Sequence, residues 1–535
     1  MGKYILAYDI GTTGVKTCLF EVDKSIELLS SASRSYQLYI LDGGGAEQEC
    51  DDWWNGMAES TAEVLANAKD VRPDMIAGIS FCSQMQGLIL VDRDGVPVRR
   101  PMSYMDQRAT EEIKKGIANG IQIAGANVSK LFQSLRITGA VAGSVKDPVW
   151  KYKWVEVHEP DKFARVYKWL DVKDYLILRC TGNFTMTDDS AFGTMLYDIR
   201  PEGRCWSREM CEMLGVNMSH LPEIIRSTDV AGHLTAEAAQ DLGLAQGTPV
   251  YGGGGDASLI GIGAGASCVG DTHIYSGTSG WVITVTDKEK VDVTSMMAAI
   301  VGADRTKYNY FAEMETAGKC LEWVKDHLAK DEIGIYVKKE GVPEDYESRN
   351  SQLYTYMTEV IRDVEPGSGG LLFAPWLHGN RCPFEDPAAR GMFIGLGLDT
   401  GKTEMIHAVL EGVFYHIRWM LECQERSVKT SKVIRFAGGG ALSPVTCQML
   451  ADILGRTLET VRSPQNAGSF GACAVTAVGL GIIPDLDAVK DYISVADTYV
   501  PDMDKHRAYK PYYKAFRKLY SSNKGIFRML AKTGK

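Results

Sequence analysis

Asp9-Ile10-Gly11-Thr12-Thr13-Gly14-Val15-Lys16 follows a short apolar run, Tyr4–Tyr8, near the start of the 535-residue chain. The stretch supplies what a nucleoside triphosphate requires: glycines that let the backbone come close, amides that can form an anion-binding nest, hydroxyls, a cation and a carboxylate. Asp9 is a candidate Mg²⁺ ligand, directly or through water. The alternative is a plain hairpin with a surface lysine. The stretch is not a Walker A loop, because no Gly-Lys-Ser/Thr follows.

The same chemistry recurs in the second half of the chain. Ser276-Gly277-Thr278-Ser279-Gly280 lies between two apolar segments, Thr272–Tyr275 and Trp281–Thr286, which predict strands. The order of strand, Gly-Thr turn and strand therefore occurs twice, which indicates two related α/β halves. We expect an N-terminal domain at 1–262 and a C-terminal domain at 263–535. Two such turns, one from each half, could grip a polyphosphate from both sides of a cleft.

Asp256 follows four consecutive glycines, Gly252–Gly255, at the end of a predicted strand. Open α/β folds bind ligands at this edge of the sheet. A kinase that phosphorylates an alcohol needs a carboxylate to accept the proton of the attacking hydroxyl, so Asp256 is the candidate base. The alternative is a helix N-cap, and both roles could hold together. The glycines lack the GxGxxG spacing of a dinucleotide-binding fingerprint.

Four further loops are candidates for the cleft. Ser83-Gln84-Met85-Gln86-Gly87 connects two predicted strands, and Tyr104-Met105-Asp106-Gln107-Arg108 carries an acid and a guanidinium that could bind sugar hydroxyls. For the second loop, a solvated turn or a structural ion pair is an equal alternative. Gly438-Gly439-Gly440-Ala441 separates a predicted strand from a helix, and either approaches adenine and ribose or serves tight packing. Trp376–Pro383 is a turn-rich segment that could flank the cleft.

Composition narrows the class of protein. The chain is 45% hydrophobic and 24% charged, as ordinary globular proteins are, and is too long for one hydrophobic core. A net charge of −10 argues against nucleic acid or an anionic membrane as the main partner. No apolar stretch reaches the length of a membrane span, and no secretion signal is evident, so we expect a cytoplasmic protein. The 12 cysteines have no zinc-site spacing.

Nearly the whole chain resembles the FGGY family of carbohydrate kinases, most closely its xylulokinase-like members. Matching segments occur in the family's order, and Pro148–Trp154 resembles the first family signature, although the residues before it depart from it. The other matching segments are Asp9–Lys16, Gln48–Trp54, Ser83–Gly87, Lys173–Leu176, Gly252–Asp256, Ser276–Ser279, Arg390–Gly395, Ala408–Gly412, Gly438–Ala441 and Gln448–Asp452.

The resemblance implies an α/β, actin-like ATPase fold, with two duplicated ribonuclease-H-like domains around a central cleft for ATP and sugar. It implies ATP and Mg²⁺ as cofactors and Asp256 as the catalytic base. The implied cofactor-binding residues are Asp9 (also the metal ligand), Gly11, Thr12, Thr13, Lys16, Gly277, Thr278, Gly318, Gly439, Gly440, Ala441 and Ser443. The implied sugar-binding residues are Gln84, Met85, Gln86, Tyr104, Asp106 and Asp256.

The sequence departs from xylulokinases at the sugar site. Gln86 stands where they usually carry His, Tyr104 where they carry Trp, and Ala257 where an Asn or Gln is customary. Because an unpaired buried polar group costs about 1–3 kcal/mol, such changes can reverse substrate preference. The resemblance favours D-xylulose as acceptor, giving D-xylulose 5-phosphate. Another ketose, gluconate or a polyol stays open, as does a non-kinase actin-like ATPase; oligomeric state is open too, a homodimer being one option.

Overall fold

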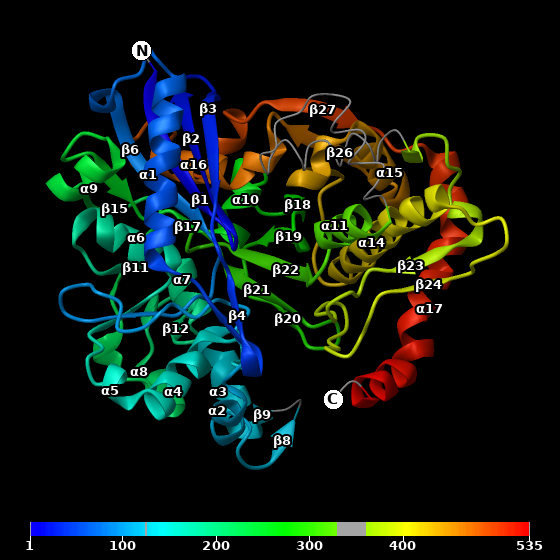
Figure 1. Ribbon diagram of the computed structural model, residues 1–535, viewed down its shortest axis with the longest axis horizontal. Coiled ribbons are helices and arrows are strands. Elements are labelled where there is room, and N and C mark those ends of the chain that lie inside the picture. The colour runs from blue at the N-terminus through cyan, green and yellow to red at the C-terminus, as the bar shows by residue number, and fades with distance from the viewer. Residues whose placement is uncertain (1, 124–125, 329–359, 534–535) are drawn as a thin grey trace.

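Two large β-sheets, one in each half of the chain, organise the computed structural model (Figure 1). It describes residues 2–123, 126–328 and 360–533. The first sheet has the order β15-β16-β6-β1-β2-β3, with β17 pairing β6. Its strands are β1 Lys3–Ile10, β2 Gly14–Val22, β3 Ile26–Ser35, β6 Ile76–Ser83, β15 Val230–His233, β16 Pro249–Tyr251 and β17 Gly254–Gly255.

The second sheet has the order β20-β21-β22-β19-β18-β25-β26-β27. Its strands are β18 Thr272–Ser276, β19 Gly280–Thr286, β20 Val291–Asp292, β21 Met297–Val301, β22 Tyr308–Met314, β25 Val433–Ala437, β26 Thr457–Val461 and β27 Val495–Tyr499. In the first sheet β1 is antiparallel to β2 and parallel to β6; in the second, β18 is antiparallel to β19 and parallel to β25. This repeated arrangement confirms the two related α/β halves predicted from the Gly-Thr turns.

Helices cover both faces of the first sheet, and the alternation of β1 explains how. Leu6, Tyr8 and Ile10 belong to one buried cluster with α1, α6 and α9, whereas Ile5 and Ala7 belong to another with α16. Successive side chains of a strand point to opposite faces, so β1 is buried on both. The helices are α1 Cys50–Asn67, α6 Val172–Thr181, α9 Ala236–Leu242, α10 Asp256–Gly263 and α16 Ala467–Gly479.

The helix α16 belongs to the second half in sequence and packs on the first sheet. It contacts β1 and β6 and pairs with α10, and Phe470 meets Phe20 of β2 edge-on, with ring centroids 4.7 Å apart. The predicted domain boundary at 262/263 stays a prediction. The helix α16 follows this boundary in sequence but packs on the sheet formed before it.

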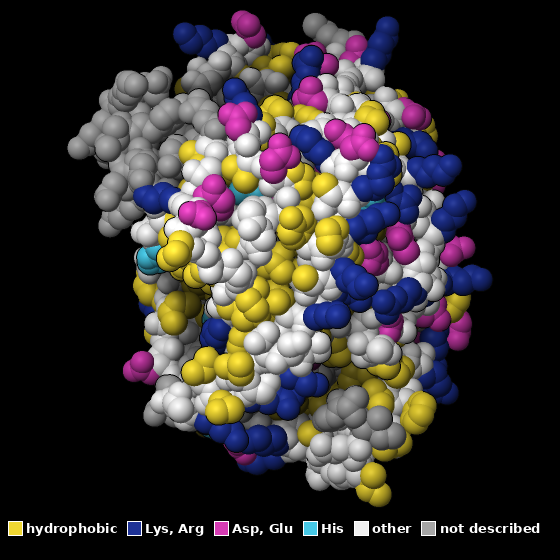
Figure 2. Space-filling view, turned by 90° about the vertical axis from the view of Figure 1, so that its right-hand side faces the viewer, with side chains coloured by type: hydrophobic (Ala, Val, Ile, Leu, Met, Phe, Trp, Pro, Cys, Tyr) yellow, Lys and Arg dark blue, Asp and Glu magenta, His cyan; other side chains and the backbone are white. Residues whose placement is uncertain are grey.

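The second sheet is covered by a long apolar helix, α14 Lys402–Gln424, which the periodicity of 404–423 predicted, together with α11 Gly318–His327 and α15 Pro444–Leu454. The last helix, α17 Met503–Thr533, packs on α14 and α15. Seen from the side of α17, the surface mixes basic, acidic and apolar side chains (Figure 2). Among the described helices, none is long and apolar enough to cross a membrane.

Smaller elements complete the two halves. In the first they are β4 Tyr39–Leu41, β5 Gly45–Glu47, β7 Ile89–Val91, α2 Thr110–Lys115, β8 Gln122–Ile123, β9 Ala126–Asn127, α3 Val128–Thr138, α4 Pro148–His158, α5 Pro160–Phe163, β10 Lys168–Leu170, β11 Thr185–Thr187, α7 Asp188–Gly193, β12 Tyr197–Asp198, β13 Cys205–Trp206, α8 Arg208–Leu214 and β14 Glu223–Ile225. In the second they are β23 Leu372–Ala374 and β24 Met392–Ile394.

Candidate active site

A cavity of about 1140 Å³ lies between the two halves. This is more room than a single small ligand needs, and suits a nucleotide beside a second substrate. The structure brings most of the sequence-predicted residues to its wall. They are Asp9, Gly11, Thr12, Thr13, Lys16, Gln84, Met85, Gln86, Tyr104, Asp256, Gly277, Thr278, Gly318 and Gly439.

Side chains from other elements hold the first Gly-Thr turn, which connects β1 to β2. The Tyr36 hydroxyl donates to the carbonyl oxygens of Gly11 (2.6 Å) and Gly14 (2.9 Å). The Gln48 amide donates to the carbonyl oxygen of Thr12 at 2.7 Å. The turn is thus fixed before any ligand binds. Neither Tyr36 nor Gln48 was assigned a role from sequence, although Gln48 opens one of the family-like segments.

Asp9 is the candidate metal ligand and lies in β1 directly before the turn. Burial raises the pKa of its carboxyl group, whereas Lys16 and a hydrogen bond from the Cys82 thiol lower it. Gly468 of α16 must be glycine here, because a Cβ atom would stand 2.5 Å from Asp9 Oδ2. The ammonium of Lys16 donates to the carbonyl oxygen of Gln465, at 2.9 Å, and so links the two halves.

The residues present fit Mg²⁺ held together with a nucleotide. Within the described ranges, no group of three or more His, Cys, Asp or Glu side chains could hold a metal by itself. Mg²⁺ does not need such a group, because one or two carboxylates plus substrate phosphates usually bind it. Asp9 supplies a carboxylate at the cavity wall beside the turn.

Asp256 is the first residue of α10 and lines the cavity. Burial raises its pKa to about 7; a hydrogen bond from the Ala257 amide (2.8 Å) opposes this, and the negative charges of Asp9 and Glu313 add to it. A carboxyl group with a pKa near neutrality is suited to accept a proton from a substrate hydroxyl. Close packing requires glycine before it at Gly253, since a Cβ there would stand 2.2 Å from the backbone oxygen of Phe81.

Gln84 and Tyr104, two of the predicted sugar-binding residues, are joined to the first turn by hydrogen bonds. The Gln84 amide donates to Gly11 O (3.1 Å) and to Gln48 Oε1 (3.0 Å), and the Thr12 hydroxyl donates to the Tyr104 hydroxyl at 3.3 Å. Gln84 Oε1 is buried and has no hydrogen-bond partner among the described residues. An unsatisfied buried acceptor at the wall of a cavity is suited to a ligand hydroxyl.

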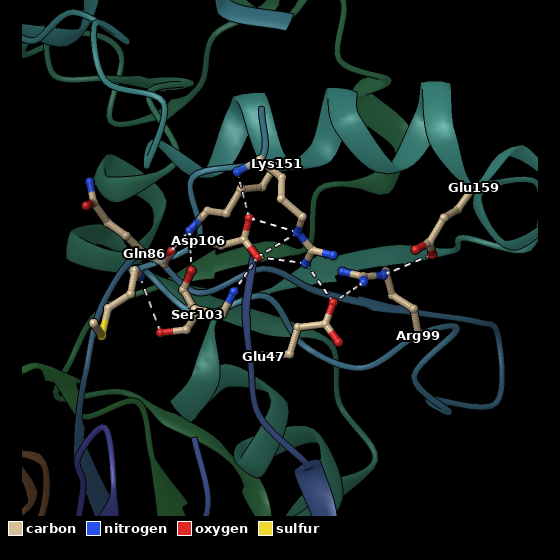
Figure 3. A network of polar contacts seen from close by, with 10 residues as sticks. Glu47, Gln86, Arg99, Ser103, Asp106, Lys151 and Glu159 are labelled. Atoms are coloured by element: carbon tan, nitrogen blue, oxygen red, sulfur yellow. Dashed lines mark hydrogen bonds and ion pairs between the residues drawn. The ribbon is translucent and has the colours of Figure 1, made fainter. Parts of the chain in front are cut away.

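Asp106 lies behind the cavity wall rather than on it, as far as the described lining residues show. Its carboxylate accepts from the Ala46 amide (2.9 Å) and from Arg108 Nη2 (2.7 Å), and Arg108 also pairs with Glu47 at 2.6 Å. Figure 3 shows this network continuing to Arg99 and Glu159. The structural ion pair, which the sequence left open as an alternative, is the arrangement observed. We therefore do not propose Asp106 as a substrate contact.

The second Gly-Thr turn is held by the start of α11. The amide of Gly318 donates to Gly277 O at 2.7 Å, and the amide of Lys319 donates to Thr278 O at 3.1 Å. A Cβ on Gly318 would stand 2.4 Å from Gly277 O, so this contact requires glycine. The backbone of α11 thus positions the second turn directly.

The third glycine loop contributes Gly438 and Gly439 to the cavity wall, while the other predicted adenosine residues lie outside the described lining. Gly440 and Ala441 are buried, and the Ser443 hydroxyl caps α15 by accepting from Thr446 N at 3.3 Å. A Cβ on Gly440 would stand 2.7 Å from Ser276 Cβ. These three residues support the wall by packing and capping.

Two cavity residues of the second half were missed from sequence. Glu313, at the end of β22, accepts from Arg381 Nη1 at 2.6 Å, and both line the cavity. Arg381 lies in the turn-rich segment Trp376–Pro383, which was expected near the cleft. Beside them, Lys146 and Glu315 form an ion pair at 3.2 Å that joins the two halves. No local motif marks Glu313.

A duplicated α/β fold, with a Gly-Thr turn from each half and a half-buried carboxylate facing one cavity, defines a phosphoryl-transfer site with an alcohol acceptor. Residues 4–263 match the N-terminal domain, and residues 273–480 the C-terminal domain, of the FGGY family of carbohydrate kinases. The chain belongs to this family. It has the actin-like ATPase fold and is an ATP-dependent sugar kinase.

Its relatives differ in the sugar they are named for. It is 27% identical over 519 residues to the xylulose kinase of Staphylococcus xylosus, covering 97% of this chain and 99% of the relative, and 28% identical over 516 residues to the gluconokinase of Bacillus subtilis, covering 95% and 94%. Solved structures of a xylulose kinase and a gluconate kinase from Lactobacillus acidophilus match with TM-scores of 0.83 and 0.82, each at 24% identity and covering 99% of this chain and 100% of the neighbour. These likenesses leave the sugar undecided.

Proposed function

We propose that the protein transfers the γ-phosphoryl group of ATP, bound with Mg²⁺, to a primary hydroxyl of a neutral ketose, with D-xylulose giving D-xylulose 5-phosphate as the first candidate. The observation that carries the proposal is that Asp256 shares one cavity with both Gly-Thr turns. Names of similar proteins support xylulose, and they keep gluconate as the rival. Another ketose or a polyol is a further alternative.

Each residue has a role that its position supports. Asp256 accepts the proton of the attacking hydroxyl as the bond to phosphorus forms. The turns at Gly11–Thr13 and Gly277–Thr278 bind the phosphates through backbone amides and hydroxyls. Asp9 would hold Mg²⁺, which supplies neutralisation of phosphate charge. Gln84 and Tyr104 orient the acceptor from the side of the first turn.

The charges on the cavity wall favour a neutral acceptor. Arg381 is already paired with Glu313, and Arg34 with Glu59 (3.1 Å) and Glu63 (2.7 Å). The carboxylates among the described lining residues are Asp9, Asp147, Asp256, Asp292, Glu313, Glu322 and Glu385, and the cations are Lys16, Arg34 and Arg381. Gluconate would bring another negative charge beside Asp256 and Glu313, which like-charge repulsion disfavours.

The test is acceptor-dependent ADP formation from Mg-ATP by the purified protein, measured with D-xylulose, D- and L-ribulose, other ketoses, erythritol, glycerol and D-gluconate. We expect saturable turnover on one neutral compound, and kcat/KM for gluconate at least about tenfold lower. Preference for gluconate would overturn the neutral-acceptor assignment. ATP binding without turnover on any acceptor would count against xylulose and the other tested sugars. The homodimer and the cytoplasmic location stay predictions.

A further inference from the structure

Gln86 has an unusual backbone conformation for a residue of its type. Its φ is +63°, in the left-handed region that glycine adopts readily and other residues seldom do. Gln86 lines the cavity. Non-glycine residues keep such a conformation where their surroundings impose it, and they cluster at functional sites. The contacts of the Gln86 backbone show what imposes it.

Two buried charged side chains hold the peptide groups of Gln86. Asp171 Oδ2 accepts from the Gln86 amide, and Asp171 Oδ1 accepts from the Gly87 amide, both at 2.9 Å. On the other side, the ammonium of Lys151 donates to the Gln86 carbonyl oxygen at 2.6 Å. Asp171 is 4% exposed and Lys151 is fully buried. Every polar backbone group of Gln86 is therefore bound by a charged partner that water hardly reaches.

Lys151 also joins the two loops of the acceptor side. Its ammonium donates to the carbonyl oxygen of Ser103 at 3.0 Å, and Ser103 directly precedes Tyr104 (Figure 3). Asp171 is a fixed support in turn, because Oδ1 accepts from the Val172 amide at the start of α6, at 2.8 Å. Gly193 of α7 lies beside the Gln86 side chain, since a Cβ there would be in ordinary contact with Gln86 Cγ, at 3.6 Å.

We propose that Asp171 and Lys151 are positioning residues that hold Gln86 in the left-handed conformation, so that its side-chain amide selects the acceptor. The inference rests on the proposed function, since it names how the acceptor side of that site is built. Specificity for the acceptor then depends on the backbone conformation in which Asp171 and Lys151 hold Gln86, as well as on the type of residue at position 86.

The first test compares D171N and K151M with the wild type on the acceptor that the panel identifies. The D171N change would turn an N–H group towards one of the two amides, and the K151M change would remove the ammonium donor. We expect the KM for the acceptor to rise about tenfold or more, with the KM for ATP changed less than about twofold. D92N is the matched control, because Asp92 Oδ1 likewise accepts from two amides, those of Asp94 (3.1 Å) and Val96 (3.0 Å), outside the cavity lining.

The second test separates positioning from general support of the fold. Glycine adopts a positive φ unaided and has no side chain to present. In a Q86G background, D171N should therefore change the acceptor KM by less than about twofold, whereas in the wild-type background it changes it about tenfold. Equal changes in both backgrounds would show that Asp171 acts independently of Gln86 and would overturn the proposal.

A third measurement does not depend on any acceptor. In the wild type, hydrogen exchange at the amides of Gln86 and Gly87 should be slow, and D171N should speed it about tenfold or more without affecting residues 9–16. K151M provides an independent variant for the same comparison. Unchanged exchange in both variants overturns the proposed positioning role. If the wild type phosphorylates no member of the panel, the proposed function fails while exchange still decides the positioning role.

Discussion

The two Gly-Thr turns look alike in sequence and are held by different means. The first, Gly11–Gly14, is bound mainly by side chains from distant elements, namely Tyr36, Gln48 and Gln84, together with one backbone bond from the Tyr36 amide to Thr13 O at 2.9 Å. The second, Gly277–Gly280, is bound by the backbone amides at the start of α11. Equivalent turns in a duplicated fold have therefore acquired separate supports.

The two turns are connected to different parts of the site. The supports of the first turn continue into the acceptor side, because Gln84 bonds to Gly11 O and Thr12 bonds to Tyr104. The support of the second turn is α11, a helix of the second half, and it depends on the close contact of Gly318 with Gly277 O. We expect changes at the first turn to affect both substrates, and changes at the second to affect the nucleotide above all.

The largest effect should come from removing the proposed base, Asp256, while leaving both turns intact. Asp256→Ala should lower kcat by roughly 10²–10⁴, because proton acceptance from the hydroxyl is lost. Both turns should still bind ATP, so its Kd, measured by calorimetry, should stay within a few-fold of the wild type. Near wild-type turnover in this variant would remove Asp256 from the mechanism.

A matched pair of glycine substitutions tests the second turn against the first. In Gly318→Ala the new Cβ would stand 2.4 Å from Gly277 O, a backbone atom that must move. In Gly11→Ala it would stand 3.2 Å from Gly14 O, which a small shift relieves. We expect kcat/KM for ATP to fall about a hundredfold in the first variant and only a few-fold in the second. Equal losses of kcat/KM for ATP in the two variants would contradict the conclusion that the turns are supported differently.

The pH dependence should distinguish the acceptor side from the phosphate turns. The pKa of Asp256 is raised to about 7, so its carboxylate is charged and able to accept a proton above that pH, and protonated below it. We therefore expect kcat/KM for the acceptor to fall about tenfold per pH unit below 7. ATP binding without acceptor should vary far less between about pH 5.5 and 7.5. If kcat/KM for the acceptor does not change between about pH 5.5 and 7.5, protonation of Asp256 does not control the reaction.

The smallest effect should come from single bonds of the first turn. Tyr36→Phe removes the one hydroxyl proton that Gly11 O and Gly14 O share, and Gln48→Ala removes the amide that bonds Thr12 O. We expect each substitution to cost about 1 kcal/mol, or about a fivefold change. We expect KM to rise for both ATP and acceptor, as steady-state kinetics would show. A rise for ATP alone would mean that the first turn, like the second, serves only the nucleotide.

Local sequence patterns predicted those parts of the site in which glycines and reactive side chains are neighbours in the chain. The two turns and Asp256 were found because glycines, hydroxyls and a carboxylate stand together in sequence. The sequence could not decide whether Asp106 binds sugar or forms a structural ion pair. The answer depends on contacts with Ala46 and Glu47, which lie far from it in the chain. Glu313 was missed because its partner Arg381 is reached only through the fold.

The halves of the fold were predicted from the repeated strand, turn and strand, and from the 3.6-residue periodicity that marks α14. The place of α16 could not be predicted that way. Its apolar residues would suit either sheet, and only the assembled structure shows which sheet they cover.

The position of α16 also determines when, during synthesis, one face of the first sheet can be covered. The strand β1 ends at residue 10, and the helix that covers its Ile5 and Ala7 begins at residue 467. At about 5–20 residues per second, a ribosome needs roughly 25 to 90 seconds to deliver that cover. During that interval the sheet face that carries Ile5 and Ala7 lacks the cover of α16. Chaperones that shield apolar surfaces have their greatest opportunity to act on this chain then.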